Sequence, residues 1–368
     1  MVKKIVALLL SSALLVIFAA GCKYEPFEIE LRREYDRPDL VGTTLNVYNW
    51  GEYISDGSEE SMNVVKEFEY RTGIKVNYST YDSNESMYSL IKYGGVSYDI
   101  VIPSDYMIER MINENMLQTI DTSKLQNYDL IDKKYKDLFF DPENKYSVPY
   151  SVGMVGLIYN TTLVEEEPDS WSVMWDERYK DDVLTFNNPR DSFAIAQFLL
   201  GQDINTKNKA DWDAAAEMLK KQKNVLQAYV MDEVYNKMES GSAAIAPYYA
   251  GDYLSMLDNN EDLAFVYPKE GVNIFVDSIC IPKNAENYEA AMLFIDFLLE
   301  PEIALANAEY IYYASPNTSV TENPDYSLKG DEIIYPTEEN MPKCEYFHDM
   351  DAETRAYFDK LWQDVKLH

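Results

Sequence analysis

Hydrophobic and polar residues follow two different periods in the first third of the chain. Apolar residues alternate with polar ones in TLNVYNW at 44–50, which predicts a half-buried strand, whereas spacings of three and four residues predict amphipathic helices. The predicted strands lie at 44–50, 74–80 and 98–102, and the predicted helices lie at 59–72, 85–92 and 108–114. Strands and helices in alternation are typical of a parallel sheet with helices on its faces, so we predict an α/β fold.

The remainder of the chain repeats this kind of pattern. Strands are predicted at 153–159 and 277–282, and helices at 192–200, 211–221, 230–240, 289–299 and 353–365. A chain of 368 residues has the length of about two domains. Ligands of open α/β sheets lie beyond the carboxyl ends of the strands. The loops 49–56, 80–85 and 103–106 are therefore the first candidates for a binding site.

The N-terminus has the basic, apolar and small-residue segments of an export signal, in that order. Lys3 and Lys4 precede an apolar run at 5–20, which is shorter than the roughly 20 residues that span a bilayer and is followed by small residues and Cys22. The segment 19–22 (AAGC) resembles a bacterial lipobox, which implies cleavage before Cys22 and lipidation of that residue. The alternative is an ordinary signal peptide that is cut nearby. The charged segment that follows, to about residue 43, is predicted to be a flexible tether.

Charge and residue counts exclude several classes of protein. A net charge of −32 disfavours nucleic acid and anionic lipid surfaces as partners, and it would attract cationic ligands. Solubility alone is the alternative explanation of the charge, and the charge by itself favours that explanation. Cys280 and Cys344 are the cysteines that remain after Cys22, and they form no CxxC motif or disulfide framework. With His348 and His368 as the only histidines, most zinc sites and a histidine-based catalytic triad are disfavoured. We expect no metal and no cofactor.

Several blocks of sequence resemble the bacterial spermidine/putrescine-binding proteins. The blocks are NWGEY at 49–53, FEYRTGIKV at 68–76, YSTYDSNESMY at 78–88, YDIVIPS at 98–104, YSVPY at 146–150, PKEG at 268–271, DS at 277–278 and SPN at 315–317. Their order and spacing carry the resemblance over nearly all of the chain from Thr44 to about Leu361. The family fold consists of two α/β lobes of the type II periplasmic-binding-protein kind, with the ligand in a cleft between them.

The resemblance also implies a division of the chain. Segments 44–152 and 277–320 would form lobe 1, segments 153–276 and 321–368 would form lobe 2, and residues 1–21 and 22–43 would be the signal peptide and the anchored tether. The crossings between lobes would lie near Val152, Asp277 and Ser319. Hinge motion would close the lobes on the ligand.

The function implied is capture of a polyamine outside the cytoplasm. The expected partners are the permease and ATPase subunits of an ABC importer, with membrane attachment only through the N-terminal lipid, and the protein is expected to be a monomer without enzymatic activity. A polyamine is a hydrocarbon chain with two or more ammonium groups. Its site therefore needs carboxylates for the amines and flat apolar or aromatic walls for the methylenes.

The resemblance assigns eleven residues to the ligand. They are Trp50, Glu52, Tyr53, Ser104, Tyr106, Asn188, Asp191, Tyr249, Phe275, Asp277 and Tyr313. Asp277 is the strongest candidate, because an acidic residue directly after the apolar run 274–276 needs a partner. Its alternative role is a hinge hydrogen bond or a helix cap, and the alternative role of the aromatic residues is plain packing.

The sequence departs from the spermidine-specific pattern of the family. Asn188 stands where a carboxylate is usual, Tyr249 and Phe275 stand where the family has tryptophan, Phe347 aligns with a glutamine, and Gly51 replaces a hydroxyl residue. Loss of one carboxylate weakens the contact to a third ammonium most. The departures therefore favour a diamine slightly over a triamine.

Three other functions stay open at this point. The same scaffold binds sugars, oligopeptides, iron and thiamine. The 31 tyrosines keep an iron site open, although the two histidines are too few for a typical one. Paired carboxylates such as Glu52 and Asp277 are also found in glycosidases, but the chain has no nucleophile elbow, P-loop or GxGxxG motif. A sensor or adhesin that uses the scaffold without a transporter is the third alternative.

Overall fold

The computed structural model describes residue 35 and residues 37–368. The predicted signal peptide, the predicted lipidation site Cys22 and most of the predicted tether lie outside these residues. Tyr35 and Leu40 are buried in an apolar cluster, and the ring of Tyr35 lies 6.3 Å from that of Phe297 in an edge-on arrangement. The packed part of the described chain therefore begins before Thr44.

The described strands form one continuous network. They are β1 (Thr44–Trp50), β2 (Lys75–Tyr81), β3 (Ile100–Val101), β4 (Ser147–Asn160), β5 (Val183–Phe186), β6 (Leu226–Val230), β7 (Ile245–Tyr249), β8 (Leu263–Val266), β9 (Val272–Cys280) and β10 (Cys344–Glu345). The order is β2-β1-β3-β9-β4-β7-β5-β6, with β8 beside β4 and β10 beside β9. Parallel pairing of β1 with β2 and β3, and of β5 with β6 and β7, gives two mostly parallel halves.

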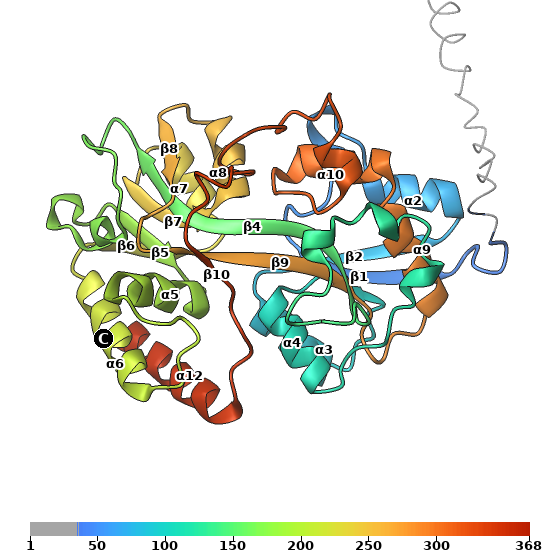
Figure 1. The fold of residues 1–368 in the computed structure, drawn as a ribbon, viewed down its shortest axis with the longest axis horizontal. Helices are drawn as coiled ribbons and strands as arrows, with labels where there is room; N and C mark the ends of the chain where they lie inside the picture. The colour runs from blue at the N-terminus through green and yellow to red at the C-terminus, as the bar shows by residue number, and fades with distance from the viewer. Residues whose placement is uncertain (1–34, 36) are drawn as a thin grey trace, which may run out of the picture.

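Two long antiparallel strands, β4 and β9, join these halves and run from one side of the molecule to the other (Figure 1). The helices are α2 (Val64–Thr72), α3 (Asn84–Tyr93), α4 (Asp105–Asn113), α5 (Pro189–Leu200), α6 (Lys209–Gln222), α7 (Glu233–Glu239), α8 (Ala250–Leu257), α9 (Tyr288–Leu298), α10 (Pro301–Ile311), α11 (Thr318–Thr321) and α12 (Ala352–Leu367). Helices α2, α3, α4, α9 and α10 surround β1–β3 and form the first lobe, whereas α5–α8 and α12 surround β5–β7 and form the second lobe (Figure 1). The two-lobed α/β fold predicted from the sequence is confirmed.

Several predicted boundaries were wrong. The helix expected from residue 59 begins at Val64, because Asn63 caps it by accepting a hydrogen bond from the backbone N–H of Lys66. The helix expected from residue 230 begins only at Glu233, since Val230 ends the strand β6. The helix expected from residue 108 already begins at Asp105.

The strand that carries Asp277 was predicted to begin at that residue, but β9 begins at Val272. Every residue of β9 is buried, because β4 pairs along most of its length and the lobes cover both faces. A strand buried on both faces has a continuous apolar run without alternation, which the sequence pattern does not separate from a loop or helix. Asp277 consequently lies in the middle of the strand that links the lobes.

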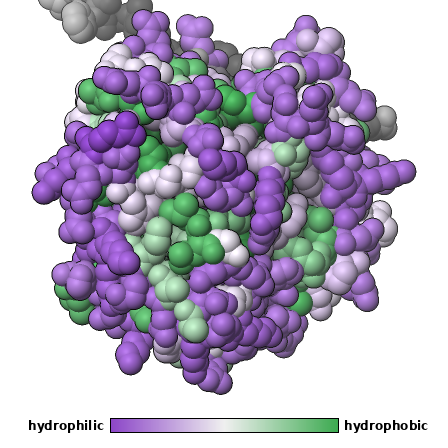
Figure 2. All heavy atoms as spheres, turned by 60° about the vertical axis from the view of Figure 1, so that its left-hand side comes forward, coloured by the Kyte–Doolittle hydropathy of each residue, from purple (hydrophilic) through white to green (hydrophobic). Residues whose placement is uncertain are grey.

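Apolar clusters fill each lobe. Phe68, Phe294 and Phe297 pack in the first lobe, whereas Phe193, Trp212 and Phe358 join α5, α6 and α12 in the second. Figure 2 shows one face of the molecule, where hydrophilic side chains dominate and hydrophobic ones gather in separate patches. Within the described residues, no helix has both the length and the apolar character needed to cross a membrane.

Candidate ligand-binding cleft

A cavity of about 540 Å³ lies where the two lobes meet. It is lined by the loop after β1, the start of α4, the start of α5, the end of β7 with α8, the strand β9 and the segment after α10. All eleven residues assigned to the ligand from the sequence line this cavity: Trp50, Glu52, Tyr53, Ser104, Tyr106, Asn188, Asp191, Tyr249, Phe275, Asp277 and Tyr313. Residues that are distant in the chain are thus brought together at one site.

Asp277 lines the cleft from β9, the strand that joins the lobes. Its Oδ2 accepts a 2.6 Å hydrogen bond from the hydroxyl of Tyr53, while its buried Oδ1 has no hydrogen-bond partner among the described residues. Burial raises the pKa of Asp277 to about 6, although the nearby hydroxyls of Ser104 and Tyr53 counteract part of the rise. A buried carboxylate oxygen without a donor is costly unless a ligand supplies one.

Asp191 is a second carboxylate, in the first turn of α5. Its Oδ2 accepts hydrogen bonds from the Tyr249 hydroxyl at 2.9 Å and from Nδ2 of Asn188 at 2.7 Å. Asn188 also caps α5, because its Oδ1 accepts a bond from the backbone N–H of Arg190. Burial raises the pKa of Asp191 to about 7 against the opposing effects of Tyr249 and Arg190. Asn188 therefore lines the cleft and positions Asp191 at the same time.

A third carboxylate, Asp252 in the first turn of α8, was not predicted from the sequence. Its two oxygens accept hydrogen bonds from different tyrosines, Oδ1 from Tyr235 at 2.8 Å and Oδ2 from Tyr313 at 3.0 Å. Burial raises its pKa to about 7, and the two tyrosine hydroxyls lower it in part. The only signal in the sequence was an acidic residue three positions after Tyr249, which reads equally well as a favourable charge at a helix N-terminus.

Aromatic rings form the walls between these carboxylates. Phe275 lies edge-on to Tyr249 at 5.4 Å between ring centroids, and Tyr53 lies edge-on to Tyr313 at 5.3 Å. Two glycines let the rings approach the backbone: a Cβ on Gly153 would collide with the ring of Phe275, and a Cβ on Gly251 would collide with that of Tyr313. The walls are thus built for flat apolar contact.

The end of β1 and the loop after it line one part of the cleft. Trp50 donates its indole N–H to the carbonyl of Ile102 at 2.9 Å, so its ring is fixed as a wall. Glu52 is exposed, has a positive φ of 49°, and accepts a 3.4 Å hydrogen bond from the Tyr310 hydroxyl. Its charge therefore faces solvent at the rim, unlike that of the buried Asp277.

The lining as a whole is acidic and aromatic. Of the described residues that line the cavity, eight are carboxylates and none is lysine or arginine. The carboxylates are Glu52, Asp82, Asp105, Asp191, Asp232, Asp252, Asp258 and Asp277. A buried arginine, Arg190, lies just behind the wall, with its guanidinium 4.4 Å from the ring of Phe347 and 5.3 Å from that of Tyr106. Such a lining favours a cation that also carries apolar surface.

Comparison with known proteins places the chain in a family. Residues 63–332 match the family described as bacterial extracellular solute-binding proteins. The chain belongs to this family. The predicted resemblance is also confirmed at the level of relatives: a spermidine/putrescine-binding periplasmic protein of Salmonella typhimurium is 35% identical over 325 residues, which cover 88% of this chain and 91% of the relative.

Solved structures agree with this assignment. A spermidine/putrescine ABC transporter substrate-binding protein of Streptococcus pneumoniae is 36% identical, with a TM-score of 0.74 and coverage of 88% of this solute-binding protein and 99% of its own chain. A lipoprotein of Treponema pallidum is 25% identical, with a TM-score of 0.77 and coverage of 88% and 100%. The fold is that of a solute-binding protein.

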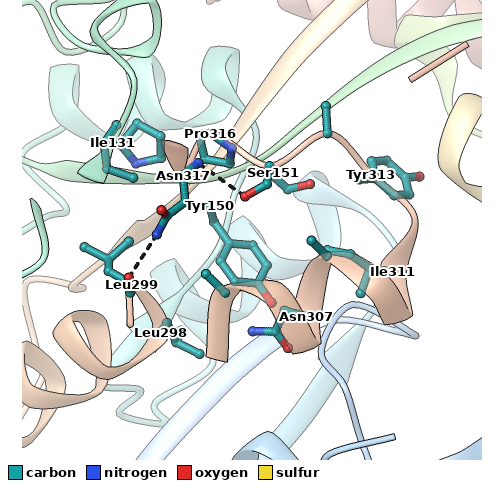
Figure 3. A pocket seen from close by; sticks show the side chains of 15 residues that line it. Ile131, Tyr150, Ser151, Leu298, Leu299, Asn307, Ile311, Tyr313, Pro316 and Asn317 are labelled. Carbon is teal, nitrogen blue, oxygen red and sulfur yellow. Dashed lines mark hydrogen bonds between the residues drawn. The ribbon is translucent and has the colours of Figure 1, made fainter. Parts of the chain in front are cut away.

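A second, much smaller cavity of about 20 Å³ lies behind the cleft of this solute-binding protein. Figure 3 shows Tyr150 and Ile311 facing it, and Asn317 closing one side with a 2.9 Å hydrogen bond from its Nδ2 to the carbonyl of Leu299. Its volume suits about one water molecule and no organic ligand. It is lined in part by Tyr313, so it belongs to the packing next to the cleft wall.

The described residues also include no candidate metal site. Among them, no group of three or more histidine, cysteine or acidic side chains has the geometry to hold a metal ion.

Proposed function

We propose that this protein binds a linear polyamine in the cleft between its lobes and delivers it to the permease of an ABC importer. The relatives named above are spermidine/putrescine-binding proteins, and the chain is similar to them over nearly their whole length. The eleven residues from Trp50 to Tyr313 that the sequence assigned to the ligand are proposed as its binding residues, and Asp252 is added to them. The protein acts by binding and release, without chemical conversion of the ligand.

The observation that carries this proposal is the incomplete hydrogen bonding of the buried Asp277 carboxylate. One of its oxygens is held by Tyr53, and the other is buried without a donor among the described residues. A primary ammonium has three N–H donors, and a hydrogen bond between charged groups contributes about 1.5–3 kcal/mol. A neutral ligand could donate a hydrogen bond, but it would leave the negative charge of the buried carboxylate unbalanced. The ammonium at one end of a polyamine is therefore assigned to Oδ1 of Asp277.

The rest of the cleft suits the rest of a polyamine. Phe275 and Tyr313 lie beside Asp277 and give apolar surface to the methylene chain, with cation–π attraction of about 0.5–2 kcal/mol for an ammonium over a ring. Asp191 and Asp252 provide negative charge elsewhere in the cavity for a second ammonium. Because Asn188 replaces a carboxylate, we propose a mild preference for a diamine over a triamine.

The proposed setting is the outer side of the cell membrane. Lipidation at Cys22 would tether a monomer near its permease, and the Treponema pallidum relative is itself a lipoprotein. The lobe boundaries 44–152 with 277–320, and 153–276 with 321–368, are proposed from the family resemblance. Metabolic labelling with a palmitate analogue tests the anchor, because incorporation into the wild type and loss in Cys22→Ser is expected. Labelling that persists in Cys22→Ser would contradict it.

A thermal-shift panel tests the ligand class. Ligand at 100 times its dissociation constant stabilises the folded state by about 2.7 kcal/mol, which corresponds to a rise of several degrees in the melting temperature. Putrescine and spermidine are expected to give this rise, and glucose, maltose and ferric citrate are not. A rise with a sugar or with ferric ion, and none with any polyamine, would overturn the proposal.

Delivery to a transporter needs a separate test. Deletion of the gene is expected to abolish high-affinity uptake of radiolabelled putrescine or spermidine by whole cells, and a plasmid copy is expected to restore it. Polyamine binding by the purified protein together with unchanged uptake in the deletion strain would indicate a sensor on the same scaffold.

A further inference from the structure

One wall of the cleft comes from the segment between β10 and α12. Residues 344–349, here named the strap, follow a long irregular segment after α11, and they begin with β10, which pairs in parallel with the first residues of β9. Figure 1 shows the chain passing across β4 and β9 at this point before it turns into α12. Phe347 of the strap is buried and lines the ligand cavity. The strap therefore contributes directly to the binding site.

The second lobe holds the strap through polar contacts. The side chain of Asn205 donates to the carbonyl of Tyr346 at 2.8 Å and accepts from the backbone N–H of His348 at 2.8 Å. The guanidinium of Arg190 lies over the ring of Phe347 at 4.4 Å and donates to the carbonyl of His348 at 3.3 Å. These contacts fix the backbone of the strap on the second lobe.

The first lobe contacts the opposite side of the strap. Glu109 of α4 accepts a 2.7 Å hydrogen bond from the backbone N–H of Asp349. The ring of Phe139 lies 4.2 Å from that of His348 and 5.6 Å from that of Tyr346. The strap is thus gripped from both lobes, and any separation of the lobes must break the contacts on one side.

We propose that the strap is a latch between the lobes, with Glu109 and Phe139 as positioning residues that hold Phe347 against the ligand. Neither Glu109 nor Phe139 lines the ligand cavity. They act on affinity through the fraction of closed protein, because the apparent dissociation constant equals the intrinsic one divided by that fraction. Breaking the latch is expected to speed ligand release more than it slows capture.

The latch predicts a specific pattern for the variants Glu109→Ala, Phe139→Ala and their combination. The double variant is expected to release putrescine or spermidine at least roughly tenfold faster in stopped-flow experiments, with a melting temperature of the unliganded protein close to that of the wild type. Glu353→Ala is the matched control, because that exposed glutamate pairs with Lys209 on the surface of the second lobe. The control is expected to behave as the wild type.

The latch proposal rests on the proposed function in one respect: the stopped-flow experiment requires that the protein binds a polyamine. Small-angle X-ray scattering measures lobe separation without any ligand, and the double variant is expected to have a larger radius of gyration than the wild type. If the wild type binds no polyamine, the proposed function fails. The latch is then tested by scattering alone, and an unchanged radius of gyration in the double variant would overturn it. If the wild type binds but the double variant shows unchanged release and unchanged scattering, the latch is wrong and the proposed function stands.

Discussion

The hydroxyl of Tyr53 donates a 2.6 Å hydrogen bond to Oδ2 of Asp277, across 224 positions of the chain. The bond joins the loop after β1 to the strand that links the lobes, and among the described residues the buried Oδ1 has no hydrogen-bond partner, although the Ser104 hydroxyl is nearby. Because Tyr53 occupies one oxygen, the carboxylate has a defined orientation before the ligand arrives. The site is preorganised for a donor at the other oxygen.

Replacement of Asp277 by asparagine is expected to lower polyamine affinity at least roughly tenfold, about 1.4 kcal/mol, because the amide keeps the shape and removes the charge. Isothermal titration calorimetry with putrescine and spermidine measures this. Tyr53→Phe is the matched control: it keeps the ring and the carboxylate but removes one hydroxyl, so a smaller loss is expected. Equal affinity of wild type and Asp277→Asn would show that the amine binds elsewhere.

The cleft carboxylates predict a pH dependence of binding. Burial raises the pKa of Asp277 to about 6 and that of Asp191 and Asp252 to about 7, and a bound ammonium favours the ionised form of each. Affinity is therefore expected to be full above about pH 8 and to fall as the pH decreases through 7 to 5. Calorimetry in buffers of different ionisation enthalpy should show proton release on binding near pH 6–7. A flat profile from pH 8 to 5 would contradict these assignments.

The same pKa shifts predict the opposite trend for the unliganded protein. The raised pKa values mean that the native state binds more protons than the unfolded state between about pH 4 and 7. These groups stabilise the fold at low pH, and their contribution is lost as the pH rises through the native pKa values. Asp252→Asn and Asp191→Asn, measured by urea denaturation at pH 5 and pH 8, should each reduce the difference between the two values. An unchanged difference would show that these groups do not titrate as described.

Gly251→Ala is expected to weaken binding without a change at any polar group. A methyl group at this position would overlap the ring of Tyr313, which must then move and which also holds Asp252. A loss of about 1 kcal/mol or more in binding free energy is expected, as for overpacking of a fitted surface. Gly95→Ala is the control for strain alone, since a Cβ there meets no atom within 4 Å but the positive φ of 65° disfavours any side chain. It is expected to lower the stability of the fold and to leave polyamine affinity unchanged. Unaltered affinity of Gly251→Ala would show that Tyr313 is not a ligand wall.

Asn188→Asp tests the preference between diamine and triamine. Aspartate still accepts the backbone N–H of Arg190 as a helix cap, but it loses the donor to Asp191 and adds a second negative charge beside it. The ratio of spermidine to putrescine affinity is expected to rise by roughly fivefold to tenfold. Parallel calorimetric titrations of the two ligands measure the ratio. A ratio equal to that of the wild type would remove Asn188 from the determinants of specificity.

The residues that could be predicted from the sequence are those that stand out from their neighbours. Asp277 follows an apolar run, Trp50 ends a clear strand and Tyr53 lies in the loop after it, so each is conspicuous without any structure. Alternating strands and helices likewise predict the α/β lobes. Local pattern and a family resemblance therefore suffice for the fold class and for the place of Asp277 in the cavity lining.

What escaped prediction depends on contacts between distant segments. Asp252 becomes a cleft residue only because Tyr313, 61 positions away, and Tyr235 both donate to it. The strap lies in a stretch with little periodic pattern, and its contacts with Glu109 are formed across 240 positions. Such pairings are set by the packing of the two lobes, which local hydrophobic periodicity does not encode.

The central claim is that an ammonium group completes the hydrogen bonding of Asp277. A crystal structure of the protein with putrescine or spermidine tests it most directly. We predict an amine nitrogen within about 2.7–3.2 Å of Oδ1 of Asp277, with the methylene chain between the rings of Phe275 and Tyr313. A ligand bound in the cleft with no nitrogen near Asp277, or a cleft without polyamine at saturating concentration, would contradict the claim.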